Sequence, residues 1–577
     1  MANPNVHDTV TLEGPLYGLQ IPDVDPSILD ERILAVGPQI SSSQKASYDV
    51  NLLAIRTLWN ARLPVHRLPT ELFVDLLAST LLRPFQTYLH EQSGRLSSDH
   101  AIVKANPCFW RSIHVGRDTR WLNLALSRSG ESNLFLDFSS SSAFLTAIPQ
   151  LIDRRNRIEH LRFSCVGVDS LEPMVPLMSA PLPCITRLDV TIDTREALYN
   201  IELPEGQAPR HYDILEFESA NLPKVTNLSL RGAQTSIPWT TSLISHLRFL
   251  DLRRCIAPSS IMSVSSFFDV LKEGQQLEEL VLYDTLSSAC ASLPSPSEQL
   301  HAVALPRLRK AALADHVAWT SLFVSYLHPP SMGEISFHGL IDNATLANNP
   351  DLSYTSMLPP DIRTFPFLKS TTSTTMSIDP RSYRIACQGS GPTVTLVMEV
   401  RSNLVEWWQN VGEGVAHFVD LLRDAPLTEL ELDLDFEFDV IDSAVFDAIL
   451  DAFPTIRELR VRSNAAAGED IVPELLAHSL GWRSPTPNDG EVKVRCPNLR
   501  VLRVQRRHES DETFLPALVE CLFDRADGGA PRLELLEVTV RRSLMQNWRE
   551  FDTHYEAVFM PMLETYKFVD EGMGIAF

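Results

Sequence analysis

The chain of 577 residues is 44% hydrophobic and 21% charged, a balance typical of folded proteins and unlike that of disordered chains. Its 50 Lys and Arg residues against 73 Asp and Glu residues give a formal net charge of −23, which argues against a nucleic-acid partner because phosphate binding needs clustered cations. Since no apolar run approaches the roughly 20 residues that cross a bilayer and the amino terminus lacks a secretory signal, we expect a protein of the cytoplasm or nucleus without a membrane partner.

The eight cysteines lie far apart in the sequence, and no Cys-x-x-Cys pair is present. Zinc sites and the disulfide frameworks of small domains both need closely and regularly spaced cysteines. We therefore expect buried thiols, no metal site and no cofactor.

The first part of the chain divides by its hydrophobic pattern. Residues 1–27 are rich in Pro, Asp and Gly and lack a sustained period, which predicts a flexible tail. In residues 28–62 the apolar side chains return at helical spacing on either side of a run of three serines, Ser41–Ser43. This pattern predicts two helices with a break at the serines.

The next segment begins as a well-marked helix. Pro69 suits the first helical position, where no amide donor is needed, and Glu71 suits the positive end of the helix dipole. Leu72 and Leu76 lie one turn apart and form an apolar stripe that requires a packing partner. Taken alone, these residues indicate no more than a well-capped helix start.

A short cassette, apolar-x-x-apolar-x-apolar, then returns almost to the carboxyl terminus. Such a period is the signature of a repeat protein, in which each cassette forms a short parallel strand and its first, fourth and sixth residues enter the core. Because the spacing is uneven, we predict an irregular leucine-rich-repeat solenoid of the α/β class over residues 116–577. The clearest copies begin at Ile158, Ile185, Val225, Leu247, Leu277, Leu427, Ile456, Leu499 and Leu533.

The segments between cassettes fall into three kinds. Six show helical spacing and are predicted to return the chain to the next strand: Phe144–Arg155, Ser265–Glu273, Val405–Leu422, Ser443–Ala452, Ile471–Leu480 and Glu512–Phe523. Weaker strands are predicted at Leu134–Leu136, Leu308–Leu313, Ile335–Phe337 and Val394–Val400. The stretch 341–392 has little apolar period and is predicted to be a long insertion or loop. Residues 543–568 return to helical spacing and are expected to cap the end of the solenoid.

One predicted strand, 429–439, alternates apolar and acidic residues, which places six carboxylates on one face. One interpretation is a docking surface for a basic segment of a partner. The next two cassettes carry five arginines, among them Arg460 and Arg503, so neutralisation between neighbouring strands is the favoured interpretation.

Enzyme signatures are missing from the sequence. There is no P-loop, no His-Glu-x-x-His helix and no Gly-x-Ser-x-Gly elbow, and Gly412 and Gly414 lack the third glycine of a dinucleotide-binding turn. We therefore expect a protein without catalytic residues.

Three features together resemble a known family: Leu68-Pro-Thr-Glu-Leu72 leading into an apolar helix, Cys108-Phe-Trp-Arg-Ser-Ile-His-Val115, and the irregular leucine-rich array after them. This arrangement is similar to that of the F-box and leucine-rich-repeat proteins abundant in mushroom-forming fungi, over residues 28 to about 570. The resemblance implies a small all-α F-box-like region at 63–115, degenerate because 83–105 lacks the family's Val-Cys-x-x-Trp pattern. In that family the F-box binds a Skp-type adaptor of a cullin–RING ubiquitin ligase, and the repeats bind the substrate.

The resemblance implies a non-catalytic substrate receptor with two sets of contact residues. The adaptor contacts would be Leu68, Pro69, Glu71, Leu72, Leu76 and Leu77. The substrate face would run through outward residues between the core leucines: Arg162, Asp189, Ser229, Asp251, Glu279, Glu431, Arg460, Arg503 and Glu537. Two alternatives remain: an adaptor-free leucine-rich scaffold whose segment 63–82 caps the solenoid, and a hydrolase with a deep pocket of convergent polar groups.

Overall fold

The computed structural model describes residues 107–115, 119–138, 140–166, 174–193, 220–232, 240–255, 263–290, 293, 300–328, 333–341, 354–358, 366–379, 382–400, 411–434, 443–463, 472–481, 483–485, 492–506, 511–540 and 548–570. The chain divides into two compact units, Met1–Trp110 and Arg111–Phe577. Within the first unit, the described part is the 3-10 turn Pro107–Trp110. The second unit holds the sheet and its helices.

The second unit is built on one sheet of 17 strands within the described residues. The nine clearest cassettes all lie on strands of this sheet, which confirms the predicted strand-and-helix repeat. The strands are β1 (Ser112–Val115), β2 (Leu134–Phe138), β3 (Ile158–Val166), β4 (Arg187–Asp193), β5 (Asn227–Arg231), β6 (Phe249–Arg253), β7 (Glu279–Tyr283), β9 (Lys310–His316), β11 (Glu334–Ile341), β12 (Thr371–Asp379), β13 (Ser382–Gly389), β14 (Thr393–Val400), β15 (Glu429–Leu434), β16 (Glu458–Ser463), β19 (Val501–Arg506), β20 (Leu535–Val540) and β21 (Tyr566–Asp570).

The cassette leucines align across the strands and form the core. Leu188 of β4 is in register with Leu228 of β5, which is in register with Leu250 of β6, and each is at most 1% exposed. Burial of a leucine side chain contributes roughly 2 kcal/mol, so a row repeated on every strand provides a continuous hydrophobic core.

The sheet is parallel apart from one strand. Its order is β1-β2-β3-β4-β5-β6-β7-β9-β11-β14-β13-β12-β15-β16-β19-β20-β21. Among the described strands of this sheet, only β13 runs antiparallel to its neighbours, because β12, β13 and β14 form a meander inserted between β11 and β15. Two small pairs lie outside the sheet: β8 (Val303–Ala304) with β10 (Leu327–His328), and β17 (Arg483–Pro485) with β18 (Val492–Val494).

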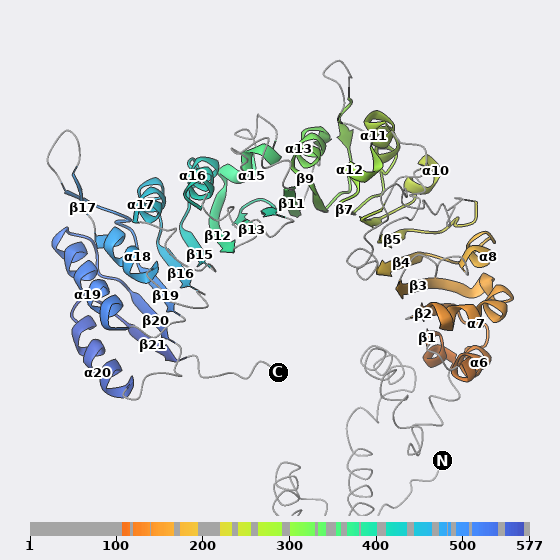
Figure 1. The fold of residues 1–577 in the computed structure, drawn as a ribbon, viewed down its shortest axis with the longest axis horizontal. Coiled ribbons are helices and arrows are strands. Elements are labelled where there is room, and N and C mark those ends of the chain that lie inside the picture. The colour runs from red at the N-terminus through yellow and green to blue at the C-terminus, as the bar shows by residue number, and fades with distance from the viewer. Residues whose placement is uncertain are drawn as a thin grey trace, which may run out of the picture. The chain divides into compact units, whose positions relative to one another are not determined.

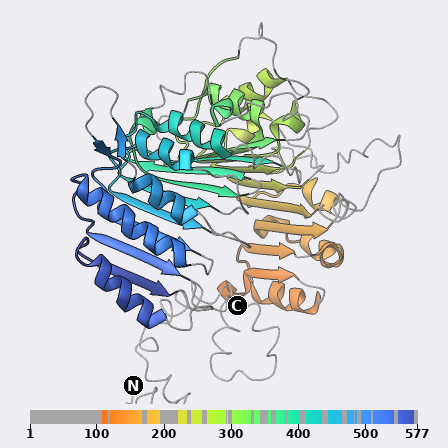
Figure 2. The same cartoon turned by 60° about the vertical axis from the view of Figure 1, so that its left-hand side comes forward.

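Helices alternate with the strands and lie on one side of the sheet (Figures 1 and 2). They return the chain from the end of one strand to the start of the next. Their bounds are α6 (Thr119–Arg128), α7 (Ser141–Ile152), α8 (Val175–Met178), α10 (Thr241–Ile244), α11 (Val264–Lys272), α12 (Leu286–Ala289), α13 (Val317–Tyr326), α15 (Pro366–Lys369), α16 (Val411–Leu422), α17 (Ser443–Ala452), α18 (Val472–Gly481), α19 (Asp511–Asp527) and α20 (Trp548–Phe559). Short 3-10 turns occupy Arg155–Arg157 and Tyr354–Met357.

Serine caps begin two of these helices. The hydroxyl of Ser140 accepts a hydrogen bond from the backbone amide of Ala143 at 3.3 Å, and that of Ser263 accepts one from Ser266 at 3.1 Å. An N-cap of this kind contributes about 1 kcal/mol because it satisfies an amide that has no partner within the helix. Both serines lie outside the cassettes, where the chain turns from strand to helix.

Three predictions about this part of the chain need correction. The stretch 341–392, predicted to be an insertion or loop, contains β12 and β13. Strand β12 buries Thr, Met and Ile side chains and β13 buries Tyr, Ile and Cys side chains, so both form strands without the leucine pattern. The carboxyl-terminal segment 543–568, predicted to be helical, ends in β21, which extends the sheet. The sheet begins at β1, before residue 116, because Ile113 enters the core and is 1% exposed.

Candidate functional site

The candidate site is the side of the sheet opposite the helices, which we call the open face. Side chains that alternate with the core leucines point to it, and within the described ranges no helix covers it (Figure 1). The alternation follows from the cassette itself, because a strand that buries its fourth and sixth residues must turn the fifth to the other face.

One row of residues crosses the open face in unbroken register. We call it the central row. Its members are His114, Asp137, Arg162, Asp189, Ser229, Asp251, Val281, Ala312, Ser336, Thr395, Ala386, Thr375, Glu431, Arg460, Arg503, Glu537 and Lys567. All of the residues that the sequence placed on a substrate face belong to this row, with one exception.

The exception is Glu279, which stands on the same face one row away. It is in register with Phe249 and Lys310, whereas Val281 occupies the central row on β7. The fifth position of this cassette is valine instead of a polar residue, and Glu279 is the polar residue two positions before it. The central row therefore loses its charge at β7.

Asp251 lies in the central row but is not available to a partner. The residue is 0% exposed, and its carboxylate is held from two sides by arginines of the open face. Arg231 donates from Nη2 to Oδ2 at 2.7 Å, and Arg253 donates from Nε to Oδ1 at 2.8 Å. Ser229 donates to Oδ2 at 3.3 Å. The surface above Asp251 is therefore made of guanidinium groups.

Asp189 is covered in a similar way. The residue is 8% exposed, and its Oδ2 accepts a hydrogen bond from Nε of Arg187 at 2.9 Å and lies 3.1 Å from Nε2 of His160. Burial opposes ionisation, but the hydrogen bond from His160 and the charge of Arg187 outweigh it and hold the pKa of Asp189 below its ordinary value. Both aspartates thus anchor cations and do not themselves present charge.

The basic side chains above these aspartates were not singled out in the sequence. Arg231 and Arg253 each follow the sixth residue of a cassette, and their side chains are 45% and 42% exposed. The sequence did contain the information needed to place them, because an arginine directly after the sixth cassette residue falls on the same face as the fifth.

The far end of the open face is a ladder of ion pairs. Glu431 Oε1 lies 2.9 Å from Nη1 of Arg462 and 3.7 Å from Nη1 of Arg460. Arg503 pairs with Glu458, and Glu537 Oε2 lies 3.1 Å from Nζ of Lys567. The contacts of Glu431 confirm the favoured interpretation at this residue, where arginines of the neighbouring strand neutralise one carboxylate of the acidic strand. Residues 435–439 lie outside the described part of the chain.

Between these two charged ends the central row is small and uncharged. From β7 to β12 its members are Val281, Ala312, Ser336, Thr395, Ala386 and Thr375. The central row therefore has three sections: one with several charged residues on β1–β6, an uncharged one on β7–β12 and an ion-paired one on β15–β21.

The predicted adaptor contacts, Leu68, Pro69, Glu71, Leu72, Leu76 and Leu77, lie outside the described residues. The motif Cys108–Val115 of the resemblance lies within the described residues. Trp110 ends the 3-10 turn and is buried at 7% exposure, and Ile113 belongs to β1.

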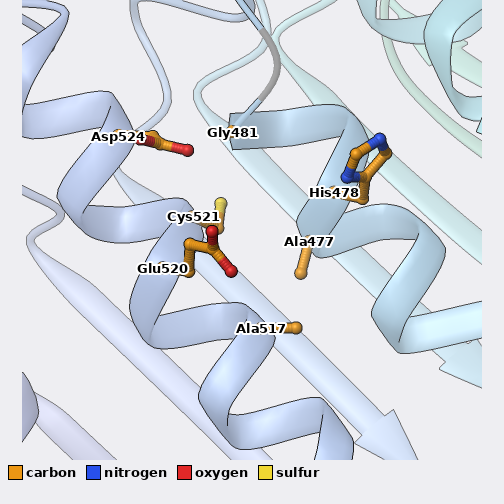
Figure 3. A pocket seen from close by; sticks show the side chains of 7 residues that line it. All are labelled: Ala477, His478, Gly481, Ala517, Glu520, Cys521 and Asp524. Carbon is orange, nitrogen blue, oxygen red and sulfur yellow. The ribbon is translucent and has the colours of Figure 1, made fainter.

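A hollow of about 430 Å³ lies between α18 and α19 on the helical side. Figure 3 shows His478 on α18, and Glu520, Cys521 and Asp524 on α19. A thiol near an imidazole and carboxylates is the composition of a cysteine hydrolase, but burial raises the pKa of Cys521 to about 12. The thiol is therefore protonated at neutral pH and is not an activated nucleophile.

Within the described residues, no cluster of three or more His, Cys, Asp or Glu side chains is placed to hold a metal ion, and no helix is long and apolar enough to cross a membrane. In comparisons with known proteins, no family matches this sequence, and no curated protein matches it significantly.

Proposed function

We propose that this protein is the substrate-recognition subunit of a cullin–RING ubiquitin ligase and has no catalytic role of its own. The F-box-like segment would bind a Skp-type adaptor, and the open face of the sheet would bind the target protein. Ubiquitin transfer would then depend on proximity, because the receptor holds its target near the enzymes that carry out the reaction.

The observation that carries the proposal is the central row. A parallel sheet with helices on one side places the fifth residue of every cassette on the other, and here those residues belong to one row in register over 17 strands. A surface of this extent suits an extended protein ligand better than a small molecule. The link to ubiquitin transfer comes from Leu68-Pro-Thr-Glu-Leu72 and its position before the repeats.

Adaptor capture tests the proposal. The tagged full-length chain is co-expressed with a Skp-type adaptor and purified, and the adaptor recovered is measured. We expect the wild type to retain the adaptor and Leu72→Asp/Leu76→Asp to lose at least nine-tenths of it, because two carboxylates in the apolar stripe oppose burial against a partner.

The matched control is Leu145→Asp on α7, where the wild-type leucine is already 55% exposed. This variant should retain the adaptor. If the wild type recovers none, or if all three proteins behave alike, the receptor function is wrong and the adaptor-free scaffold takes its place.

A further inference from the structure

A second row of in-register residues crosses the open face two positions beyond the central row. Its members on β3 to β7 are Ser164, Thr191, Arg231, Arg253 and Tyr283. Every one of these side chains carries a hydrogen-bond donor: two hydroxyls, two guanidinium groups and a phenol. None of the five is a carboxylate, so we call this set the donor row.

The two arginines at the centre of the donor row share a single carboxylate. Arg231 bonds to Oδ2 of Asp251 through Nε at 3.1 Å and Nη2 at 2.7 Å, while Arg253 bonds to Oδ1 through Nε at 2.8 Å. The side chain of Asp251 is 1% exposed and those of the arginines are 45% and 42% exposed. Among the described residues, one buried negative charge is therefore paired with two positive charges, which leaves this cluster with an excess of one positive charge.

The shared carboxylate also fixes the arginines in place. Arg253 uses only Nε for Asp251, so within the described residues both of its Nη groups are free to donate. A guanidinium that is already anchored loses less side-chain entropy when it binds a second anion than a mobile one does. The pair is thus prepared to hold an oxyanion between neighbouring strands.

The surroundings of the pair favour the same kind of ligand. Toward β7, the guanidinium carbon of Arg254 lies 5.8 Å from the centre of the Tyr283 ring. On β4, Arg187 pairs with Asp189. Adjacent strands are about 4.8 Å apart, so five donors in register span about 19 Å, the length of roughly six extended residues.

We propose that the donor row binds an acidic, extended segment of a partner protein, with one carboxylate seated between Arg231 and Arg253. Thr191 and Tyr283 flank the seated carboxylate and donate to neighbouring acidic side chains. The assignment rests on the proposed function, in which the open face receives the target, and names the chemistry that the target presents.

Peptide binding to the purified full-length chain tests this assignment. The probes are two fluorescein-labelled peptides of equal length, one with six Glu-Gly repeats and one with six Gln-Gly repeats, which differ in charge and little in shape. Fluorescence anisotropy should show binding of the Glu-Gly peptide, at least ten-fold weaker binding of the Gln-Gly peptide, and a decline as salt is raised.

The decisive pair of variants is Arg253→Gln and Arg460→Gln. Each removes one arginine of similar exposure and leaves its carboxylate with another arginine: Arg231 remains on Asp251, and Arg462 remains on Glu431. We expect Arg253→Gln to weaken binding of the Glu-Gly peptide at least five-fold and Arg460→Gln to change it less than two-fold. Thermal melting of both variants confirms that they are folded.

Three results would overturn the assignment: no binding of the Glu-Gly peptide, equal binding of both peptides, or equal losses in the two variants. The assay contains no adaptor, so its failure removes the acidic segment as the ligand and leaves adaptor capture untouched. Loss of adaptor capture, in turn, would remove the ligase function and leave the peptide result standing.

Discussion

Arg525 donates a hydrogen bond from Nη1 to the backbone oxygen of Arg495 at 2.7 Å, from a position that is only 3% exposed. Its Nη2 donates to the backbone oxygen of Cys496 at 3.0 Å, so one guanidinium of α19 satisfies two carbonyls of the preceding segment. Burial lowers the pKa of Arg525. Arg495 in turn donates to Asp451 at 2.7 Å and to the backbone oxygen of Ser479 at 3.1 Å, which ties α17 and α18 to the same segment.

This arrangement predicts that Arg525→Ala destabilises the carboxyl-terminal repeats. The substitution leaves two buried carbonyls without their donor and opens a cavity, which together cost about 3 kcal/mol. Thermal unfolding followed by circular dichroism measures the effect as a lowered melting temperature. The exposed residue Arg532 supplies the control, since Arg532→Ala should stay within about 0.5 kcal/mol of wild type. Equal melting of the two variants would refute the role assigned to Arg525.

Gly232 directly follows β5 with φ of +109°, and its amide donates to the backbone oxygen of Arg253 at 2.8 Å. A Cβ atom there would lie 2.2 Å from the backbone oxygen of Ile192, which is too close for any real contact. We expect Gly232→Ala to destabilise the protein by more than about 2 kcal/mol, because backbone strain and a backbone clash add together.

Gly529 provides the matched comparison for Gly232. It also has positive φ, +80°, but a Cβ atom would meet nothing within 4 Å. Gly529→Ala should therefore lower the free energy of unfolding only by the backbone strain of an alanine at positive φ, about 1 kcal/mol. Chemical denaturation of both variants separates the clash from the strain, and equal costs would show that crowding at Ile192 contributes nothing.

Asp315 predicts a pH-dependent contribution to stability. Its Oδ2 accepts hydrogen bonds from the backbone amides of Thr285 at 2.9 Å and Leu286 at 2.7 Å, and the residue is 2% exposed. Burial raises the pKa of Asp315, although hydrogen bonds from Ser287, His316 and Leu286 oppose the shift. The folded state therefore binds the proton more tightly than the unfolded state, in which the pKa of an aspartate is about 3.9.

The direction of the pH dependence follows from the difference between the pKa of Asp315 in the folded state and in the unfolded state. As pH rises from about 4 through the raised folded pKa, the unfolded state binds fewer protons than the folded state, so this group's contribution to stability falls. The free energy of unfolding of the wild type relative to Asp315→Asn should thus decrease over this range, as measured by urea denaturation at several pH values. Asp269→Asn, at an exposed position, controls for the loss of one charge. A relative stability that rises with pH would contradict the expectation.

The buried thiols should be protected from alkylation. Burial raises the pKa of Cys387 to about 11 and that of Cys496 to about 12, so both are protonated at pH 8. Cys184 is only half-buried. Among the six cysteines whose burial the structure describes, iodoacetamide applied to the native protein should modify Cys184 first, and peptide mass spectrometry identifies the site. In urea the difference should vanish, and early modification of Cys496 in the native protein would show that its segment opens readily.

The cassettes were sufficient to predict the repeat itself. At the copies beginning with Ile158, Val225 and Leu499, the first, fourth and sixth residues are all buried, as the period requires. The reason is local: a strand with apolar residues at these positions buries one face whatever its neighbours are. The helix predicted at Ser443–Ala452 has the same bounds in the structure, since amphipathic periodicity is also local.

The strand predicted at Val394–Val400 is β14, but the other two strands of the meander, β12 and β13, could not be predicted in the same way. Strand β12 uses Thr371, Thr374, Met376 and Ile378 as its buried residues, and the hydroxyl of Thr374 donates to the backbone oxygen of Ala386 at 3.1 Å. A threonine becomes a core residue only when a neighbouring strand accepts its hydrogen bond. The sequence of one strand does not contain that neighbour.

For the open face, the sequence alone determined which residues point away from the core, because alternation along a strand depends only on position. The tertiary structure decided which of them are accessible. Asp251 and Arg253 were equally polar in the sequence, but register places Arg231 beside Arg253, and the two guanidinium groups cover the carboxylate between them. Burial and ion pairing depend on residues that are distant along the chain, so the surface that meets a partner is a property of the assembled sheet.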